Sequence, residues 1–304
     1  MASVATASVG ATPASPSAVH LIPREGRRRR RPSIGSVARY ATLILLSVLF
    51  LLPFAWMVGT SLTPADEVLN RNRPLFPRDP AWSNYREALT VLPFHLFLKN
   101  TLLVALLCTI GQTLSAACVA FAFARLRFPG RDALFLIVLS TMMLPPQVTM
   151  IPTFIMFTIP GWIDSLKPLI VPSFFGGGAF FIFLLRQFFL TIPIELEEAA
   201  RLDGCSTFGV FRHVILPNSK PALTTVALFA FIGHWNDFLG PLIYTQSMGN
   251  KTLAVGLSAF KSLHGNDYHL LMAASVAVLV PILVIFFFSQ RYFVEGIVTT
   301  GVKG

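Results

Sequence analysis

Charged residues are scarce in this chain. They make up 12% of its 304 residues, whereas 54% are hydrophobic and the mean hydropathy is +0.67. A soluble domain carries about twice that charged fraction. Tyrosine is also rare, with 5 residues against 28 phenylalanines, so most aromatic rings have no polar group. These scarcities argue against a water-soluble domain. They predict an all-α polytopic membrane protein whose fold follows from the bilayer.

Residue clusters that carry chemistry are also missing. The three cysteines, Cys108, Cys118 and Cys205, have no paired spacing, so the sequence supports neither a disulfide framework nor a metal site. His213 and the other histidines form no ligand set, and no nucleophile or acid–base constellation is present. We therefore expect no catalytic residue, metal or cofactor in this chain, and a membrane enzyme is a poor alternative.

Positive charge gathers at the ends of apolar runs. The net charge of +10 would suggest nucleic acid for a soluble protein, and the run Arg27–Arg31 resembles such a patch. A cytoplasmic anchor just before the first apolar run explains it better, so we expect no nucleic-acid partner. The Ala-, Ser-, Pro- and Arg-rich composition of residues 1–39 predicts a disordered basic cytoplasmic tail. A cleaved signal peptide is an alternative, but the apolar run that follows is longer than a signal core.

Six apolar stretches are long enough to cross a bilayer, which takes about 20 residues. They lie at residues 40–61, 96–124, 133–158, 168–190, 221–244 and 269–290. Residues 62–95 form an extracytoplasmic segment, predicted to be irregular and to end in a short helix. Pro145-Pro146 in the third stretch and Gly176–Gly178 in the fourth predict kinks or unwound turns. These interruptions serve either packing or a gate hinge.

Lys and Arg residues set the orientation. Sixteen of the 24 fall in segments that are inside if the N-terminus is inside, and eight fall in the outer segments. This asymmetry predicts that both termini face the cytoplasm, so the loop 191–220 and the tail 291–304 are cytoplasmic. Residues 96–290 then form a membrane domain of five helices that follows the first helix at 40–61.

The loop 191–220 has an internal pattern. Acidic residues crowd the first turn of a predicted helix, where the helix dipole favours them: Glu195, Glu197 and Glu198. Asp203-Gly204 ends that helix. Ser206 or Thr207 can cap a second helix, whose apolar residues follow at helical spacing until Pro217 stops it. An amphipathic loop on the bilayer surface is the alternative, although three glutamates suit an anionic leaflet poorly.

The loop resembles the cytoplasmic EAA loop of permease subunits of bacterial ABC importers. Three residues separate Glu198-Ala199-Ala200 from Gly204, and ten residues separate Gly204 from Ile215-Leu216-Pro217. The chain is similar to the carbohydrate-uptake branch, of which the maltose permease is the model. Further similar stretches are Asn84-Tyr85, Phe123–Gly130, Trp235–Phe238, Gln290–Gly296 and Gly301–Gly304. The resemblance covers about residues 40–304, and only the N-terminal tail departs from it.

The resemblance implies a type I ABC importer permease fold with six transmembrane helices, in the bacterial inner membrane. It also implies a second permease subunit, two ATPase subunits that bind ATP, and an extracytoplasmic solute-binding protein. This chain has no Gly-rich phosphate loop, so it does not supply the ATPase. Its loop enters an ATPase groove, where Glu198 pairs with a basic residue and Ala199 and Ala200 form a flat strip. Asp203-Gly204 gives the tight turn.

Trp235, Asn236 and Asp237 are the residues that we expect to line a substrate pathway. Asp237 lies well inside the fifth apolar stretch, about 24 Å from its cytoplasmic end at 1.5 Å per residue. Intramembrane carboxylates usually face a cavity or a partner. A structural contact with Lys99 or a backbone group is the alternative. The sequence does not name the cargo, and the resemblance allows a sugar, an oligosaccharide or glycerol phosphate. An ion-coupled secondary carrier remains the competing function, although no inverted repeat is visible.

Overall fold

Every regular element that the structure describes is helical. The computed structural model describes residues 34–263 and 267–301. The chain forms two units, residues 1–50 and residues 51–304. Most of the predicted N-terminal tail, residues 1–33, lies outside the described residues.

Helix α1 runs from Ile34 to Ser61 and begins earlier than the sequence predicts. Residues 34–39 are therefore helical rather than part of a disordered tail. The helix begins before its apolar run, because the hydrogen bonds of an α-helix join backbone groups and do not require apolar side chains. Arg39 Nε also donates to the carbonyl of Gly35 at 3.2 Å. The stretch Ala38–Ser61 has the length and composition of a membrane span.

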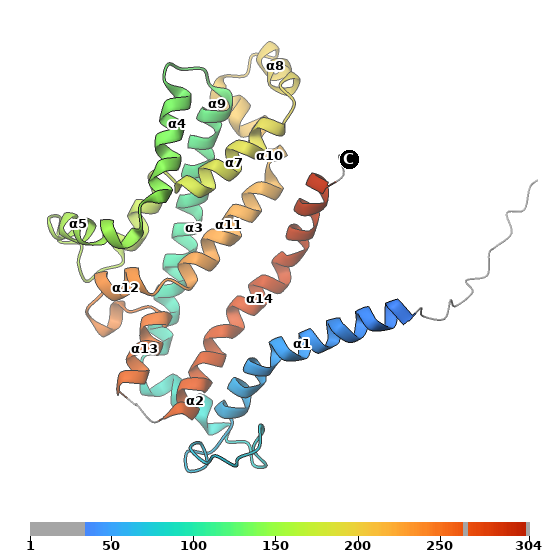
Figure 1. The fold of residues 1–304 in the computed structure, drawn as a ribbon. Coiled ribbons are helices and arrows are strands. Elements are labelled where there is room, and N and C mark those ends of the chain that lie inside the picture. Colours follow the sequence, from blue (N-terminus) through green and yellow to red (C-terminus); the bar gives the residue numbers. More distant parts are fainter. Residues whose placement is uncertain (1–33, 264–266, 302–304) are drawn as a thin grey trace, which may run out of the picture. The chain divides into compact units, whose positions relative to one another are not determined.

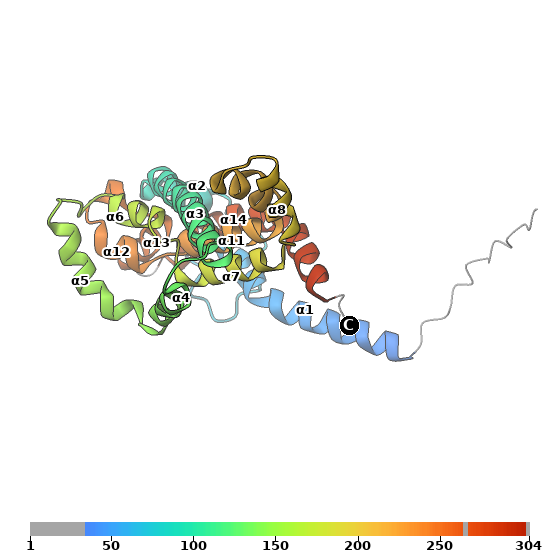
Figure 2. The same cartoon turned by 90° about the horizontal axis from the view of Figure 1, so that it is seen from above.

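Helix α3 (Phe94–Arg125) packs against α7 (Ala179–Thr191) and α11 (Lys220–Trp235), and Figures 1 and 2 both show the three side by side. Its buried face carries small residues: Ala105, Gly111, Ala116, Ala117, Ala120 and Ala124. Small residues let helix backbones approach closely in a membrane protein, where helix association depends on packing. The predicted second span is confirmed as a helix with nearly the expected ends.

The third predicted span is two helices rather than one. Helix α4 (Arg131–Ser140) and the turn η1 (Thr141–Met143) meet α5 (Pro146–Thr158) at an angle of 99°. Pro145 has no N–H to continue the helix, and it restricts Leu144 to extended backbone, with ψ of 118°. The predicted interruption at Pro145-Pro146 is confirmed and is sharper than a kink.

The fourth predicted span is also interrupted where the glycines lie. The short helices α6 (Lys167–Ile170) and η2 (Val171–Phe174) precede the break, and α7 follows it. Gly176, Gly177 and Gly178 have positive φ values of 90°, 60° and 81°. A Cβ on Gly177 would lie 2.3 Å from the backbone nitrogen of Ala116 in α3. The glycine turn therefore lets the chain approach α3, which supports the packing interpretation.

The fifth predicted span ends early. Helix α11 stops at Trp235, and a separate short helix, α12 (Leu239–Tyr244), follows it. The turn η4 (Met248–Asn250) and helices α13 (Leu253–Leu263) and α14 (Tyr268–Gly301) complete the order. Because α14 continues unbroken to Gly301, the predicted tail after residue 290 is helical over its described part. Among the described residues, three helices are long and apolar enough to cross a membrane, or five if each bent pair is one span.

Polar contacts hold together one end of the second unit. At this end, Asn84 in α2 (Ser83–Val91) donates through Nδ2 to the carbonyls of Ser61 and Thr63, each at 2.9 Å. At the same end, Asn100 Nδ2 donates to the carbonyl of Gly249 at 2.7 Å. Helix α8 lies at the other end of α3 (Figure 1). The segment 62–82 is irregular and leads into α2, as predicted.

Asp164 joins two loops of this unit. It has a positive φ of 59°, and its carboxylate accepts the backbone N–H groups of Gln246 at 2.9 Å and Ser247 at 2.8 Å. The Ser247 hydroxyl also donates to it, as does the Asn250 side chain at 3.2 Å. These hydrogen bonds, the Ser247 hydroxyl first among them, hold the pKa of Asp164 well below its ordinary value. The segment before α6 is thus fixed to the segment after α12.

The packing role of the glycine turn can be tested by two matched substitutions. Gly176→Ala and Gly177→Ala both place a side chain on backbone with positive φ. Only the Cβ at 177 also meets α3, because a Cβ at 176 has nothing within 4 Å. Overpacking costs about 1–3 kcal/mol, so we expect Gly177→Ala to lower the free energy of unfolding by that much more. Thermal unfolding in one detergent checks this, and equal midpoints would contradict it.

Candidate functional site

Helix α8 (Glu195–Leu202) forms the first half of the patterned loop, as predicted. The helix ends in a turn: Asp203 is its C-cap, and Gly204 follows with a φ of 85°. The Gly204 N–H donates to the carbonyl of Arg201 at 3.0 Å, and the Cys205 N–H donates to that of Ala200 at 2.9 Å. This pair of bonds is a Schellman motif, which needs a left-handed residue at the position of Gly204.

The second half of the loop begins at the predicted cap. Ser206 Oγ accepts the N–H of Gly209 at 3.1 Å and starts α9 (Thr207–Val210). The chain then widens into a π-helical turn, η3 (Phe211–Ile215), and continues as α10 (Leu216–Asn218). A bend of 80° leads into α11.

Pro217 does not stop the second helix, so that prediction is wrong. In the π turn the Leu216 N–H reaches the carbonyl of Phe211. Pro217 therefore falls in the first turn of α10, where its missing N–H needs no helical partner. The helix ends at Asn218 instead. Ile215 is fully buried, Leu216 is half-buried and Pro217 is exposed.

The inner face of the loop is part of the membrane-domain core. Val210, Phe211 and Ile215 are buried together with residues of α3 and α7, and the rings of Phe211 and Phe121 lie 5.0 Å apart between centroids. Burying aliphatic and aromatic side chains of this size stabilises the docked loop by about 1.5–3 kcal/mol each. The loop is therefore fixed to the helices rather than lying loosely on a bilayer.

The outer face of the loop is exposed and mixes acidic with apolar side chains. It includes Glu195, Leu196, Glu198, Ala199, Leu202, Asp203, Gly204 and Phe208, together with the basic Arg201. Leu202 is 89% exposed and Phe208 is 67% exposed. Large apolar side chains grouped on an otherwise polar loop mark a surface that binds a partner. Ala200 is half-buried, so it belongs to this face only in part.

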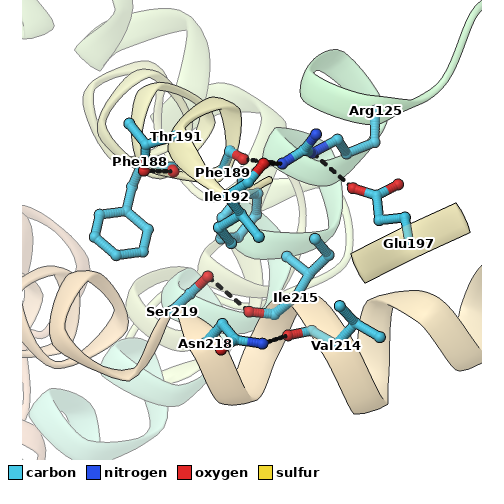
Figure 3. Close-up of polar contacts among 10 residues, drawn as sticks. All are labelled: Arg125, Phe188, Phe189, Thr191, Ile192, Glu197, Val214, Ile215, Asn218 and Ser219. Atoms are coloured by element: carbon cyan, nitrogen blue, oxygen red, sulfur yellow. Dashed lines mark hydrogen bonds and ion pairs between the residues drawn. The ribbon is translucent and has the colours of Figure 1, made fainter. Parts of the chain in front are cut away.

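Glu197 points away from the other two glutamates and into the protein. Its side chain is 4% exposed and that of Arg125, at the end of α3, is 7% exposed; Glu197 Oε1 and Arg125 Nε lie 2.8 Å apart. The two atoms are not aligned as a hydrogen bond, so the contact is an ion pair. Arg125 Nη2 also donates to the carbonyls of Phe189 and Ile192, the latter at 2.5 Å (Figure 3). The sequence pattern did not separate Glu197 from Glu198, although Glu197 and the half-buried Ala200 share a helix face.

The three predicted pathway residues do not lie together on one surface. Trp235 is 3% exposed and stacks on Phe231, with 5.6 Å between ring centroids. Asn236 is exposed at the end of α11, and its Nδ2 donates to the carbonyl of Ile232 at 2.9 Å. Trp235 is therefore a core residue, whereas Asn236 is exposed and Asp237 is half-buried.

Asp237 lies at a helix break, so its predicted position inside a continuous span is wrong. The half-buried carboxylate accepts the N–H of Gly240 at 3.2 Å and so caps the first turn of α12. Among the described residues, the Gly240 N–H is the hydrogen-bond donor to this carboxylate, and no ion pair joins it to Lys99. The polar run Asn236-Asp237 ends α11 because both side chains compete for backbone groups near a helix end.

A cavity of about 360 Å³ lies beside Asp237. It is lined by Pro146, Gln147, Thr149, Met150, Thr153, Asp237, Leu239, Gly240, Ile243 and Tyr244. The helix break at Pro145-Pro146 and the helix break at Asp237 therefore both adjoin this cavity. Gln147, Thr149, Thr153 and Tyr244 were missed in the sequence, where only the proline pair signalled this region. Trp235 is not among the lining residues.

Comparisons with known proteins agree with this architecture. A chain of a bacterial ABC transporter involved in the import of the acidic polysaccharide alginate has the same fold, with a TM-score of 0.74 and 24% identity. The match covers 86% of this chain and 96% of that one. The fold is thus that of an ABC importer permease.

The family follows from the sequence comparisons. The family described as "binding-protein-dependent transport system inner membrane component" matches residues 114–298, and the chain belongs to this family. The arabinooligosaccharides transport system permease protein AraQ of Bacillus subtilis (strain 168) is 34% identical over 276 residues, which cover 90% of this chain and 97% of that protein. The diacetylchitobiose uptake system permease protein DasC of Streptomyces coelicolor is 30% identical, over 90% of this chain and 100% of that protein. The trehalose/maltose transport system permease protein MalG of Thermococcus litoralis is 31% identical, over 86% of this chain and 94% of that protein.

The turn at Gly204 predicts different effects for Ala and Asn. A Cβ at Gly204 meets nothing within 4 Å, so only the positive φ opposes a side chain. Left-handed backbone costs most residues about 1–2 kcal/mol, whereas Asn tolerates it. We expect hydrogen exchange of the segment 195–206 to be about 5–30 times faster in Gly204→Ala than in the wild type. Gly204→Asn is expected to stay close to the wild type, and equal rates in all three proteins would contradict the motif's role.

Proposed function

We propose that this chain is one of two membrane-spanning permease subunits of an ATP-driven importer, and that the cargo is a carbohydrate. The observation that carries the proposal is the loop α8–α10, whose inner face is core and whose outer face is exposed. The relatives' names support the cargo class, because they include arabinooligosaccharide, diacetylchitobiose and trehalose/maltose transport. Which of these sugars, if any, enters here is set by the binding protein.

The partners follow from this role. Two ATPase subunits bind the ATP and receive the coupling loops, since this chain carries no phosphate-binding loop of its own. A second, non-identical permease completes the pore, and an extracytoplasmic binding protein delivers the sugar. The alginate transporter of similar fold has been solved in complex with its alginate pentasaccharide-bound periplasmic protein, which supports that arrangement.

The proposed topology has six spans in the cytoplasmic membrane with both termini inside. Support comes from the excess of Lys and Arg in the inner segments. The contacts of the second unit agree, because Asp164 joins two of the predicted outer segments, and Asn100, near the start of the second span, contacts one of them. At the opposite end Arg125 joins two predicted inner segments. The sixth span is assigned to α14, whose apolar part includes Tyr268–Val284.

Coupling uses the outer face as a helix-in-groove contact. Glu198 pairs with a basic residue of the ATPase, Ala199 lets the helix lie flat, and Leu202 fills an apolar part of the groove. Gly204 allows close approach of the backbone, because a side chain there would project into open space and towards the partner. When ATP closes the ATPase pair, the inner face carries the movement through Phe211 and Ile215 to the membrane helices.

The outer face predicts a specific effect of charge reversal. Glu198→Lys places like charges in the groove, and we expect ATP-dependent uptake to fall at least tenfold, with weaker copurification of the ATPase. The control is Asp132→Lys, the same change of charge at an exposed residue in the first turn of α4. That variant is expected to retain both properties. Normal uptake and copurification in Glu198→Lys would show that the loop does not dock as proposed.

The sugar pathway is proposed to pass the cavity beside Asp237. Two helix breaks meet there, and backbone groups freed at membrane depth must face protein or water. Broken helices often build the binding sites of membrane transporters. The lining offers an amide, hydroxyls, a carboxylate and the Tyr244 ring, which suit a polyhydroxylated ligand. Of the three predicted residues, Asp237 lines this cavity and Asn236 precedes it in the sequence. Trp235 packs inside the core, against Phe231 of α11.

Two substitutions separate the structural bond of Asp237 from a role in the pathway. Asp237→Asn keeps an oxygen that can accept the Gly240 N–H, whereas Asp237→Ala removes it. Because Asn keeps the bond to Gly240, we expect Asp237→Asn to assemble normally. A hydrogen bond from the sugar to a charged group is worth about 1.5–3 kcal/mol, so loss of the charge should reduce uptake tenfold or more. The readout is uptake of the sugar that the cognate binding protein retains. Wild-type uptake in Asp237→Asn, with failure of Asp237→Ala alone, would show a purely structural role.

A further inference from the structure

We propose that Arg125 and Glu197 form a buried anchor that makes α8 move together with α3 and α7, and that this anchor is required for coupling but not for docking of the ATPase. The inference rests on the proposed function of the loop. The anchor consists of the Arg125 guanidinium, the Glu197 carboxylate and the carbonyls of Phe189 and Ile192.

The guanidinium of Arg125 connects three elements at once. It comes from the last residue of α3, contacts Glu197 in α8 at 2.8 Å, and donates to the carbonyl of Ile192 just after α7 at 2.5 Å. It also donates to the carbonyl of Phe189 in the last turn of α7. The Phe189 carbonyl also accepts the Ile192 N–H at 3.2 Å, and a cation at the end of a helix is favoured by the helix dipole. Figure 3 shows these groups converging on Arg125.

Helix α8 has little else that holds it from the side. Of its eight side chains, all within the described residues, Glu197 is the one that is buried. Ala200 is half-buried and the remaining six are exposed. Ile192 just before α8 and Ala200 within it also contact the core, but the large buried side chains that follow α8 in the loop begin at Val210, with Phe211 and Ile215 after it. Without the anchor, α8 would remain attached at its two ends but could tilt about the Gly204 turn.

A buried ion pair of this kind is better suited to fixing geometry than to adding stability. Desolvation of both charges offsets much of their attraction, so an apolar pair of similar volume can be equally stable. The planar guanidinium, in contrast, holds several acceptors in one fixed arrangement. Because Glu197 faces inward, it leaves Glu198 and Leu202 free to contact the ATPase. The two neighbouring glutamates thus divide the work: Glu198 docks and Glu197 transmits.

Cys205 provides a direct report on the anchor. It is half-buried and packs against the core just after α8, whereas Cys108 is fully buried. In a Cys118→Ser background, a membrane-impermeant maleimide applied to the purified complex therefore reports on Cys205. We expect Arg125→Gln and Glu197→Gln to raise the labelling rate about fivefold or more. Arg125→Lys retains the charge without the fork and is expected to give an intermediate rate.

The same variants are examined for docking and for coupling. We expect both Gln variants to copurify with the ATPase as the wild type does, while ATP-dependent uptake falls at least fivefold. Arg127→Gln, at an exposed arginine two residues further along, is the matched control and is expected to label and transport normally. If Arg125→Gln fails to assemble, Glu197→Gln, which preserves size and polarity, decides the question.

Two results would overturn the anchor. One is unchanged Cys205 labelling in both Gln variants, and the other is faster labelling with normal uptake. Both results differ from failure of the proposed function itself. If the proposed function were wrong, the wild-type complex would not bind an ATPase or would not need ATP for uptake, whatever the state of residues 125 and 197.

Discussion

The close approach of α3 to α7 and α11 is the contact on which the rest of the molecule depends. It is possible because α3 presents alanines, such as Ala116 and Ala120, and because Gly177 has no side chain to separate the backbones. One end of this three-helix contact carries the loop α8–α10. The cavity beside Asp237 adjoins the break at the end of α11. Both proposed sites thus adjoin the same packed group of helices.

This arrangement relates the two sites physically. The coupling loop bears on the core through Phe211 and Ile215 and on the end of α3 through Arg125. The cavity is formed where α5 and α12 begin after their breaks. A movement imposed at the loop can therefore reach the cavity through α11 without unfolding any span.

Much of the fold could be predicted from the sequence because bilayer length and hydropathy constrain it strongly. The second span was expected at residues 96–124 and is Phe94–Arg125. The first helix of the loop and its end at Gly204 followed from acidic residues in the first turn and a glycine after the last. What the sequence left open depends on tertiary contacts. Glu197 and Glu198 are equivalent in any propensity scale, and only the position of Arg125 decides which one turns inward. Pro217 likewise predicts a helix end until a π turn places it in a new first turn. The break at Asp237 was hidden in an apolar stretch whose composition still suits a span.

The energy source for uptake tests the central claim most directly. Vesicles containing the complete complex and its binding protein can be loaded with hydrolysable ATP, or given an ion gradient without ATP, and the initial rate of sugar entry measured. The account predicts uptake that requires ATP hydrolysis and persists when ion gradients are collapsed. Uptake driven by an ion gradient in the absence of ATP would contradict it and would favour a secondary carrier.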